Sequence, residues 1–136
     1  MESDNSKKFA IKNIRKDKLV TNRSSIKSVH TEFQVLFEGN HVNLCNMNYF
    51  FTTQERFYFV MPLMVGGDLK VQLKRRKASS NFKENEIKFY ITQVILGLSE
   101  LHRNQILHRD LKLQNLMINE KGFLKIIDFG IARLLR

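Results

Sequence analysis

The side chains best suited to chemistry are concentrated near the end of the chain. They lie between His108 and Gly130, a span of 23 residues. The polar members that could react or bind are Asp110, Lys112, Asn115 and Asp128. A carboxylate base, an amine that neutralises phosphate charge, and a carboxylate and an amide oxygen for a hard metal ion are the groups that phosphoryl transfer from Mg-ATP requires.

The segment between Asn115 and Asp128 predicts how these two residues are positioned. Two short apolar runs, at 116–118 and 123–126, flank the polar sequence 119–122, which is the composition of a hairpin turn. Paired strands lie about 4.8 Å apart, so the residues just outside the hairpin are brought side by side. We therefore expect Asn115 and Asp128 to face one site and to act as Mg²⁺ ligands.

The order HRDLKLQN at 108–115, followed by DFG at 128–130, resembles the catalytic loop and metal-binding segment of eukaryotic protein kinases. Either triplet alone arises by chance, but the joint occurrence with Lys112 and Asn115 argues against coincidence. The resemblance implies that Asp110 takes the proton of the acceptor hydroxyl, that Lys112 neutralises the transferred phosphoryl group, and that Asn115 and Asp128 hold Mg²⁺. A Lys two residues after the Asp is typical of serine/threonine kinases, which implies a Ser or Thr acceptor in a protein substrate.

Two residues upstream extend the resemblance. The apolar run at 9–11 ends in Lys12, like the small-lobe strand whose Lys holds the ATP phosphates, although a Lys at a strand edge is commonly only a surface charge. Apolar residues then recur with a helical period over 26–37 and place Glu32 beside the apolar stripe. The resemblance implies an ion pair between Lys12 and Glu32.

The connection between the two lobes is predicted at residues 62–67. Apolar runs at 44–51 and 57–61, separated by a polar turn, indicate a second hairpin before it. The resemblance implies that Met61 is the gatekeeper and that the backbone of Pro62 and Met64 faces the adenine edge. Pro62 lacks an N–H but keeps its carbonyl acceptor.

The same resemblance implies three further contacts with the nucleotide. Asp68 is expected near the ribose, and Ala10 and Met117 are expected above and below the purine ring. Lone apolar residues of this kind are equally consistent with an ordinary core.

A long helix is predicted from Asn81 to Arg103, with Asn81 as its N-cap and apolar residues at a 3.6-residue period. The order from Phe82 to Asp110 and the glycines of the connection resemble the AGC group of kinases. The resemblance also implies a stacked column between the lobes, made of Leu36, Met47, His108 and Phe129, with His108 packing and supporting the loop rather than exchanging protons. The apolar face of the long helix is expected to be exposed and to make this chain poorly soluble.

The predicted fold class is α+β: an incomplete kinase-like domain with a small-lobe sheet and one helix, a hinge, and the first part of a helical large lobe. We expect a disordered leader at 1–8, a small lobe at 9–61, a hinge at 62–67 and a partial large lobe at 68–136. None of the 11 residues before Lys12 is Gly, so the glycine-rich loop of the family is expected to be missing, and the large lobe ends shortly after Gly130.

Composition bounds the remaining possibilities. The net charge is +10, and a basic run at 70–77 raises a nucleic-acid role, but no aromatic residues interleave with it and a basic run is usually a solvated helix face. The single cysteine allows no internal disulfide, and the apolar run at 57–65 is too short to span a bilayer. The expected residence is cytoplasmic, with the nucleus as the alternative.

Two functions from different classes follow. The first is an ATP-dependent, Mg²⁺-dependent serine/threonine protein kinase present as a partial domain. The alternative is a catalytically inactive kinase-like fragment that binds nucleotide or protein partners. Intact catalytic side chains favour the first, and the missing segments at either end favour the second.

Overall fold

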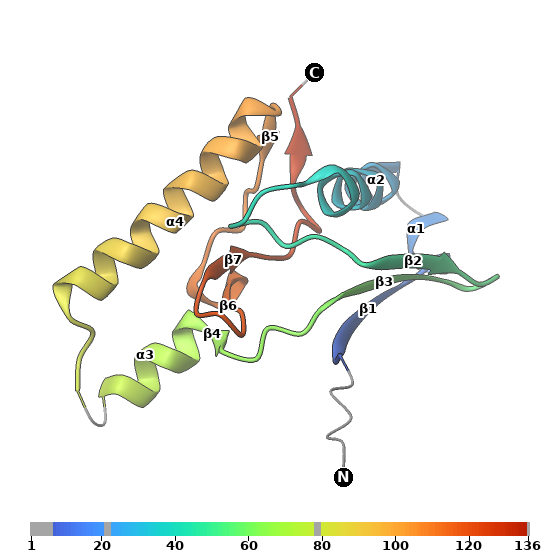
Figure 1. Ribbon diagram of the computed structural model, residues 1–136. Helices are drawn as coiled ribbons and strands as arrows, with labels where there is room; N and C mark the ends of the chain where they lie inside the picture. Colours follow the sequence, from blue (N-terminus) through green and yellow to red (C-terminus); the bar gives the residue numbers. More distant parts are fainter. Residues whose placement is uncertain (1–6, 21–22, 78–79, 136) are drawn as a thin grey trace, which may run out of the picture.

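The computed structural model describes residues 7–20, 23–77 and 80–135 of the chain. Figure 1 shows a small antiparallel sheet with helix α2 on one side of the molecule and the long helix α4 on the other, with the β6–β7 hairpin between them. This α+β arrangement is the predicted fold class. Most of the predicted leader, residues 1–6, lies outside the described residues.

The N-terminal sheet contains β1 (Phe9–Arg15), β2 (Tyr49–Thr52) and β3 (Arg56–Pro62) in the order β1-β3-β2. All pairs are antiparallel, and the register places Lys12 opposite Phe59 at the centre of β1. The predicted hairpin between β2 and β3 is confirmed. Its first strand begins later than expected, because Leu44 and Cys45 pair with Ile126 of another sheet instead.

Two helices follow β1 along the chain. The short helix α1 spans Asp17–Val20, and α2 spans Arg23–Glu38. The helical period predicted for residues 26–37 is therefore confirmed, and α2 buries Val35 and Leu36 in the core. Glu32 lies on the same helix and is only 1% exposed, so this ionisable side chain is held inside the protein.

The hairpin that precedes Asp128 forms as predicted. Strands β6 (Leu116–Ile118) and β7 (Leu124–Ile126) pair antiparallel, and the two-residue strand β4 (Gly67–Asp68) adds to β6. Asn119 closes the turn, because its side-chain oxygen accepts hydrogen bonds from the backbone N–H groups of Lys121 and Phe123. The 3₁₀ turn η1 (Leu113–Asn115) leads directly into β6.

Helices α3 (Leu69–Lys77) and α4 (Glu84–Arg103) follow β4 in the chain, and β5 (Ile106–Leu107) pairs with β8 (Arg133–Leu134). The predicted N-cap of α4 is wrong by two residues. Lys83, not Asn81, is the N-cap, because the side chain of Glu86 accepts the Lys83 N–H at 2.8 Å. Phe82 is held outside the helix by edge contact with Tyr90 and by Arg76 above its ring.

Helix α4 carries large apolar side chains that are in contact with solvent on more than one of its faces. They are Ile87, Phe89, Ile91, Ile95 and Leu96. The exposed apolar surface predicted for this helix is therefore present, while poor solubility remains a prediction. No helix among the described residues is both long enough and apolar enough to cross a bilayer.

Candidate active site

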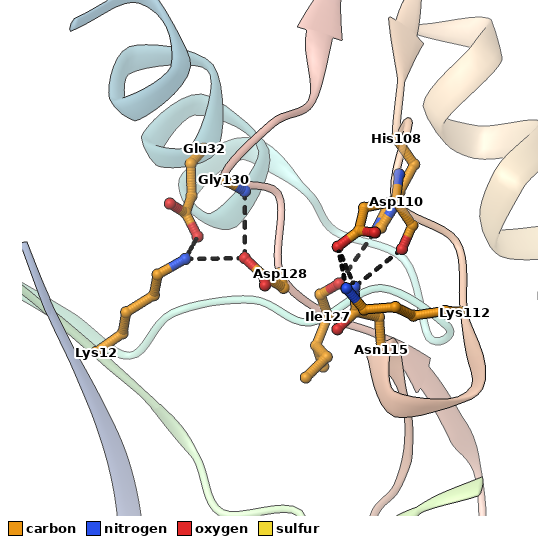
Figure 2. Close-up of polar contacts among 9 residues, drawn as sticks. All are labelled: Lys12, Glu32, His108, Asp110, Lys112, Asn115, Ile127, Asp128 and Gly130. Carbon is orange, nitrogen blue, oxygen red and sulfur yellow. Dashed lines mark hydrogen bonds and ion pairs between the residues drawn. The ribbon is translucent and has the colours of Figure 1, made fainter. Parts of the chain in front are cut away.

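Lys12 is in contact with two acidic residues that the sequence also indicated, Glu32 and Asp128. Its Nζ lies 2.5 Å from Oε1 of Glu32 and 2.9 Å from Oδ1 of Asp128 (Figure 2). The residues come from β1, from α2 and from the segment after β7, so the contact joins three separate elements. The ion pair expected between Lys12 and Glu32 is present, and its extension to Asp128 was not foreseen.

Burial and charge set the protonation of this cluster. Burial alone would lower the pKa of Lys12, but attraction to Glu32 and hydrogen bonds to both carboxylates outweigh it and raise that pKa. Burial raises the pKa of Glu32 despite the opposing effect of Lys12. Burial also acts to raise the pKa of Asp128, yet the hydrogen bond and charge of Lys12 hold it below its ordinary value. Lys12 thus carries its positive charge between two acids.

A second cluster surrounds Asp110 on the loop before η1. Oδ2 of Asp110 accepts hydrogen bonds from Lys112 Nζ at 2.6 Å and from Asn115 Nδ2 at 3.0 Å. Asn115 Nδ2 also donates to the backbone carbonyl of Asp110 at 2.9 Å. The hydrogen bond from Lys112 lowers the pKa of Asp110, against a smaller opposing effect of burial. Asp110 is therefore an ionised acceptor in a fixed position.

The buried side chain of His108 holds this loop in place through packing and hydrogen bonds. It is 3% exposed, and its ring packs edge-on against Phe129 with centroids 5.4 Å apart. Nδ1 accepts from the Asp110 N–H at 3.2 Å, while Nε2 lies 3.0 Å from the carbonyl of Ile127. Because a carbonyl can only accept, Nε2 carries the proton and the imidazole is neutral in this arrangement. The predicted role in packing and loop support matches these contacts.

Asp128 lies between the two clusters in Figure 2, with Lys12 and Glu32 on one side and Asp110, Lys112 and Asn115 on the other. Its backbone has φ 60°, and Arg109 beside Asp110 has φ 64°. Non-glycine residues rarely adopt this left-handed conformation, and at Arg109 it has no local side-chain compensation of the kind Asp and Asn provide. Such strain is typical of functional sites, where surrounding contacts hold it in place.

The predicted metal ligands keep oxygen atoms available. Oδ1 of Asp128 is bonded to Lys12 and to the Gly130 N–H, and Asn115 donates through Nδ2 alone. Within the part of the chain that the structure describes, Oδ2 of Asp128 and Oδ1 of Asn115 have no hydrogen-bond partner. One carboxylate and one amide oxygen suit a Mg²⁺ ion that takes its other ligands from phosphate and water.

A cavity of about 270 Å³ opens beside Lys12 and Asp128. Eight of the nine residues predicted around the nucleotide line it: Ala10, Lys12, Glu32, Met61, Pro62, Met64, Met117 and Asp128. Asp68 does not line this cavity. Its side chain instead accepts the Val71 N–H at 2.9 Å and caps the start of α3.

The cavity is also lined by four residues that the sequence did not indicate as nucleotide contacts. They are Leu36, Cys45, Leu63 and Ile127. The resemblance places Leu36 only in the stacked column, whereas the position of Ile127 directly before Asp128 is a signal that could have indicated it. Cys45 is buried, and burial raises the pKa of its thiol to about 11, so the group is a neutral apolar wall.

A separate cavity of about 670 Å³ is lined by residues of α2, by Arg109 and by the segment 132–134. Four of the side chains that line it are basic or can become so: Lys27, His30, Arg109 and Arg133. Acidic side chains are missing from its described lining, and Arg109 is tied to the Ile131 carbonyl at 2.7 Å. This cavity is suited to an anion rather than to a cation.

The two-lobed arrangement, with a lysine and acid pair on one side of a cavity and an acid, lysine and amide cluster on the other, defines a kinase-like site. The family model for the protein kinase domain matches residues 1–136, and the chain belongs to that family.

Individual proteins that are similar to this chain are also named as protein kinases. The chain is 39% identical over 97% of its length to serine/threonine-protein kinase akt-2 of Caenorhabditis elegans, and 39% identical over 94% of its length to protein kinase C-like 1 of Candida albicans. It is 32% identical over 98% of its length to human serine/threonine-protein kinase 32C. These matches cover 24%, 12% and 26% of the respective relatives, so the chain spans at most about a quarter of their length. The predicted resemblance to AGC kinases is confirmed by these relatives.

Proposed function

We propose that this chain is the nucleotide-binding and proton-accepting part of a serine/threonine protein kinase that transfers phosphate from Mg-ATP to a protein hydroxyl. The observation that supports this most directly is the pair of charged clusters around one cavity. Lys12, held between Glu32 and Asp128, provides a fixed cation, and Asp110, held by Lys112 and Asn115, provides a fixed anion.

The adenine is proposed to occupy the cavity of about 270 Å³, which is of a size and apolar character suited to a purine. Ala10 and Met117 lie on its walls, with Met61, Pro62 and Met64 at the connection between the lobes. Asp68 remains a proposed ribose contact, for which its side chain would have to leave the cap of α3. The proposed domain boundaries are those at 9–61, 62–67 and 68–136.

The proposed chemistry is positioning and charge stabilisation. Bound Mg²⁺ would supply positive charge next to the phosphates, and the free oxygens of Asp128 and Asn115 are the atoms proposed to hold it. Lys12 would bind the non-transferred phosphates, and Lys112 would offset charge on the transferred group. Asp110 would orient the acceptor hydroxyl and accept its proton. Its lowered pKa keeps it ionised, which suffices because a loose transition state needs little base strength.

Binding and turnover test separate parts of this proposal. Calorimetry on this chain should detect Mg-ATP, and Asp128→Asn should weaken that binding, while Asp110→Asn should leave it near the starting value. In the complete natural protein, Asp110→Asn should lower turnover on a protein substrate about 10²–10⁴-fold. Unchanged turnover in that variant would rule out Asp110 as the base.

The alternative proposal is a kinase-like module that binds nucleotide or a protein without turnover. Mg-ATP binding by the complete protein, with no transfer to any Ser or Thr acceptor, would favour it. Cytoplasmic or nuclear residence also remains a proposal, supported by a single buried thiol that has no disulfide partner in the chain.

A further inference from the structure

Helix α3 presents an unusual line of charge. Lys70, Lys74 and Lys77 are spaced four and three residues apart, so they fall within about 60° of one another around the helix axis. All three are exposed. We call these three residues the lysine stripe. Like charges at such spacings destabilise a helix by about 0.2–0.5 kcal/mol per pair, so the arrangement works against the stability of α3.

Neighbouring acids do not neutralise the stripe. Asp68 caps α3 through the Val71 N–H, Glu84 pairs with Lys88 at 2.6 Å, and Glu86 pairs with Arg76 at 2.6 Å. Within the described residues, no ion pair or hydrogen bond involves the side chains of the lysine stripe. The three amines are therefore free to bind an external anion.

The helix dipole explains only part of the pattern. Positive side chains in the last turn are favourable, which accounts for Lys74 and Lys77 as helix stabilisers. Lys70 lies in the first turn, where a positive charge is unfavourable and where α3 has no acid of its own. Its position is better explained by a role for the stripe as a whole.

The location of the stripe links it to the candidate active site. Helix α3 packs against η1, the turn that ends at Asn115, and against β4 and β6. A chain bound along the outer face of α3 would therefore lie on the element that supports the Asp110 loop.

We propose that the lysine stripe docks an acidic, extended segment of a protein partner, which, on the proposed function, is the phosphate-accepting protein. Along α3 the lysines are about 6 Å and 4.5 Å apart. Alternate side chains of an extended strand repeat at about 6.6–6.8 Å, a spacing that long lysine side chains can match. The stripe is about 10.5 Å long and none of its members is aromatic, which favours a short acidic peptide over a nucleic acid that stacks its bases.

The test uses a fluorescein-labelled peptide of alternating Asp and Ser and measures its anisotropy with this chain at low salt, without nucleotide. The variant Lys70→Gln/Lys74→Gln/Lys77→Gln should bind about tenfold more weakly. The control Lys7→Gln/Lys8→Gln/Lys121→Gln removes the same charge from exposed lysines elsewhere and should bind like the parent chain. All six substitutions are at exposed side chains, so folding should be preserved.

Three outcomes would overturn the proposal: equal weakening in both variants, no weakening in the stripe variant, or tighter stripe-dependent binding of a labelled RNA of equal charge. Calorimetry with Mg-ATP on the same variants keeps the two proposals apart. Peptide binding that depends on the stripe, in a chain that does not bind Mg-ATP, would leave the docking surface standing and the proposed function rejected. Mg-ATP binding without stripe-dependent peptide binding would reject the docking surface and leave the proposed function standing.

Discussion

Asn43 and Gln93, fifty positions apart in the chain, share a buried hydrogen bond of 3.0 Å between Nδ2 of Asn43 and Oε1 of Gln93. The same Gln93 oxygen accepts the Leu124 N–H at 2.8 Å, and Asn43 Nδ2 also donates to the Leu124 carbonyl at 3.0 Å. These contacts connect α4, the segment after α2, and strand β7 that leads to Asp128. One side-chain amide on the long helix therefore fixes the strand that positions the candidate metal ligand.

Replacing Gln93 with Leu should destabilise the protein by about 1–3 kcal/mol, because the buried Leu124 N–H would lose its acceptor. Urea unfolding followed by circular dichroism measures this change. Gln34→Leu is the matched control, since Gln34 bonds only Glu38 on the surface of α2 and its loss should change stability by at most about 0.5 kcal/mol. Equal effects of the two substitutions would contradict the importance of the buried network.

The titration of Asp128 should depend on Lys12. Carboxyl NMR should give a midpoint below the ordinary value of 3.8, and Lys12→Met should move it upward because burial then acts without the opposing amine. Since its folded-state pKa is lowered, Asp128 stabilises the fold above pH 3.8 and loses that contribution as the pH falls through the lowered value. Asp128→Asn identifies the signal, and Lys8→Met is the control. A midpoint that does not move in Lys12→Met would show that the ion pair is absent in solution.

Gly66 and Gly67 should respond differently to substitution by alanine. A Cβ at Gly66 would meet the side chain and carbonyl of Ile118 at 2.7–2.8 Å, whereas one at Gly67 would enter open space. Gly67→Ala meets only the cost of φ 68°, roughly 1 kcal/mol, while Gly66→Ala adds overpacking of about 1–3 kcal/mol and disturbs the pairing of β4 with β6. Thermal unfolding of both variants measures the order. A larger loss of stability for Gly67→Ala would mean that the backbone angle of Gly67 constrains this segment more than the contact of Gly66 with Ile118 does.

Local patterns in the sequence were sufficient for much of the fold. The helical period around Glu32 and the polar turn at 119–122 each depend on residues close in the chain, and both elements form as predicted. The sequence alone misplaces the start of α4, because both Asn81 and Lys83 have a Glu three residues later and Asn is the better capping residue by type. The choice was decided by Glu86 and by the contacts of Phe82, which involve a second helix.

Features that depend on distant residues were not predictable in this way. The network of Asn43, Gln93 and Leu124 leaves no periodic signal, since its members lie on three separate elements. Likewise the carboxylate of Asp68 is of a type that could bind a ribose. The N–H groups in the first turn of α3 lack partners within the helix, however, and the carboxylate accepts a hydrogen bond from one of them instead. The Lys12 contact with Glu32 was inferred from the resemblance, whereas its second contact with Asp128 required the three-dimensional structure.

The single amine of Lys12 has a broader consequence for how energies should be assigned in this protein. Because it binds two acids from opposite ends of the chain, positions 12, 32 and 128 form one thermodynamic unit. The free energy attributed to any one of them will change with the identity of the other two, so single substitutions there are non-additive and only double-mutant cycles can apportion the coupling.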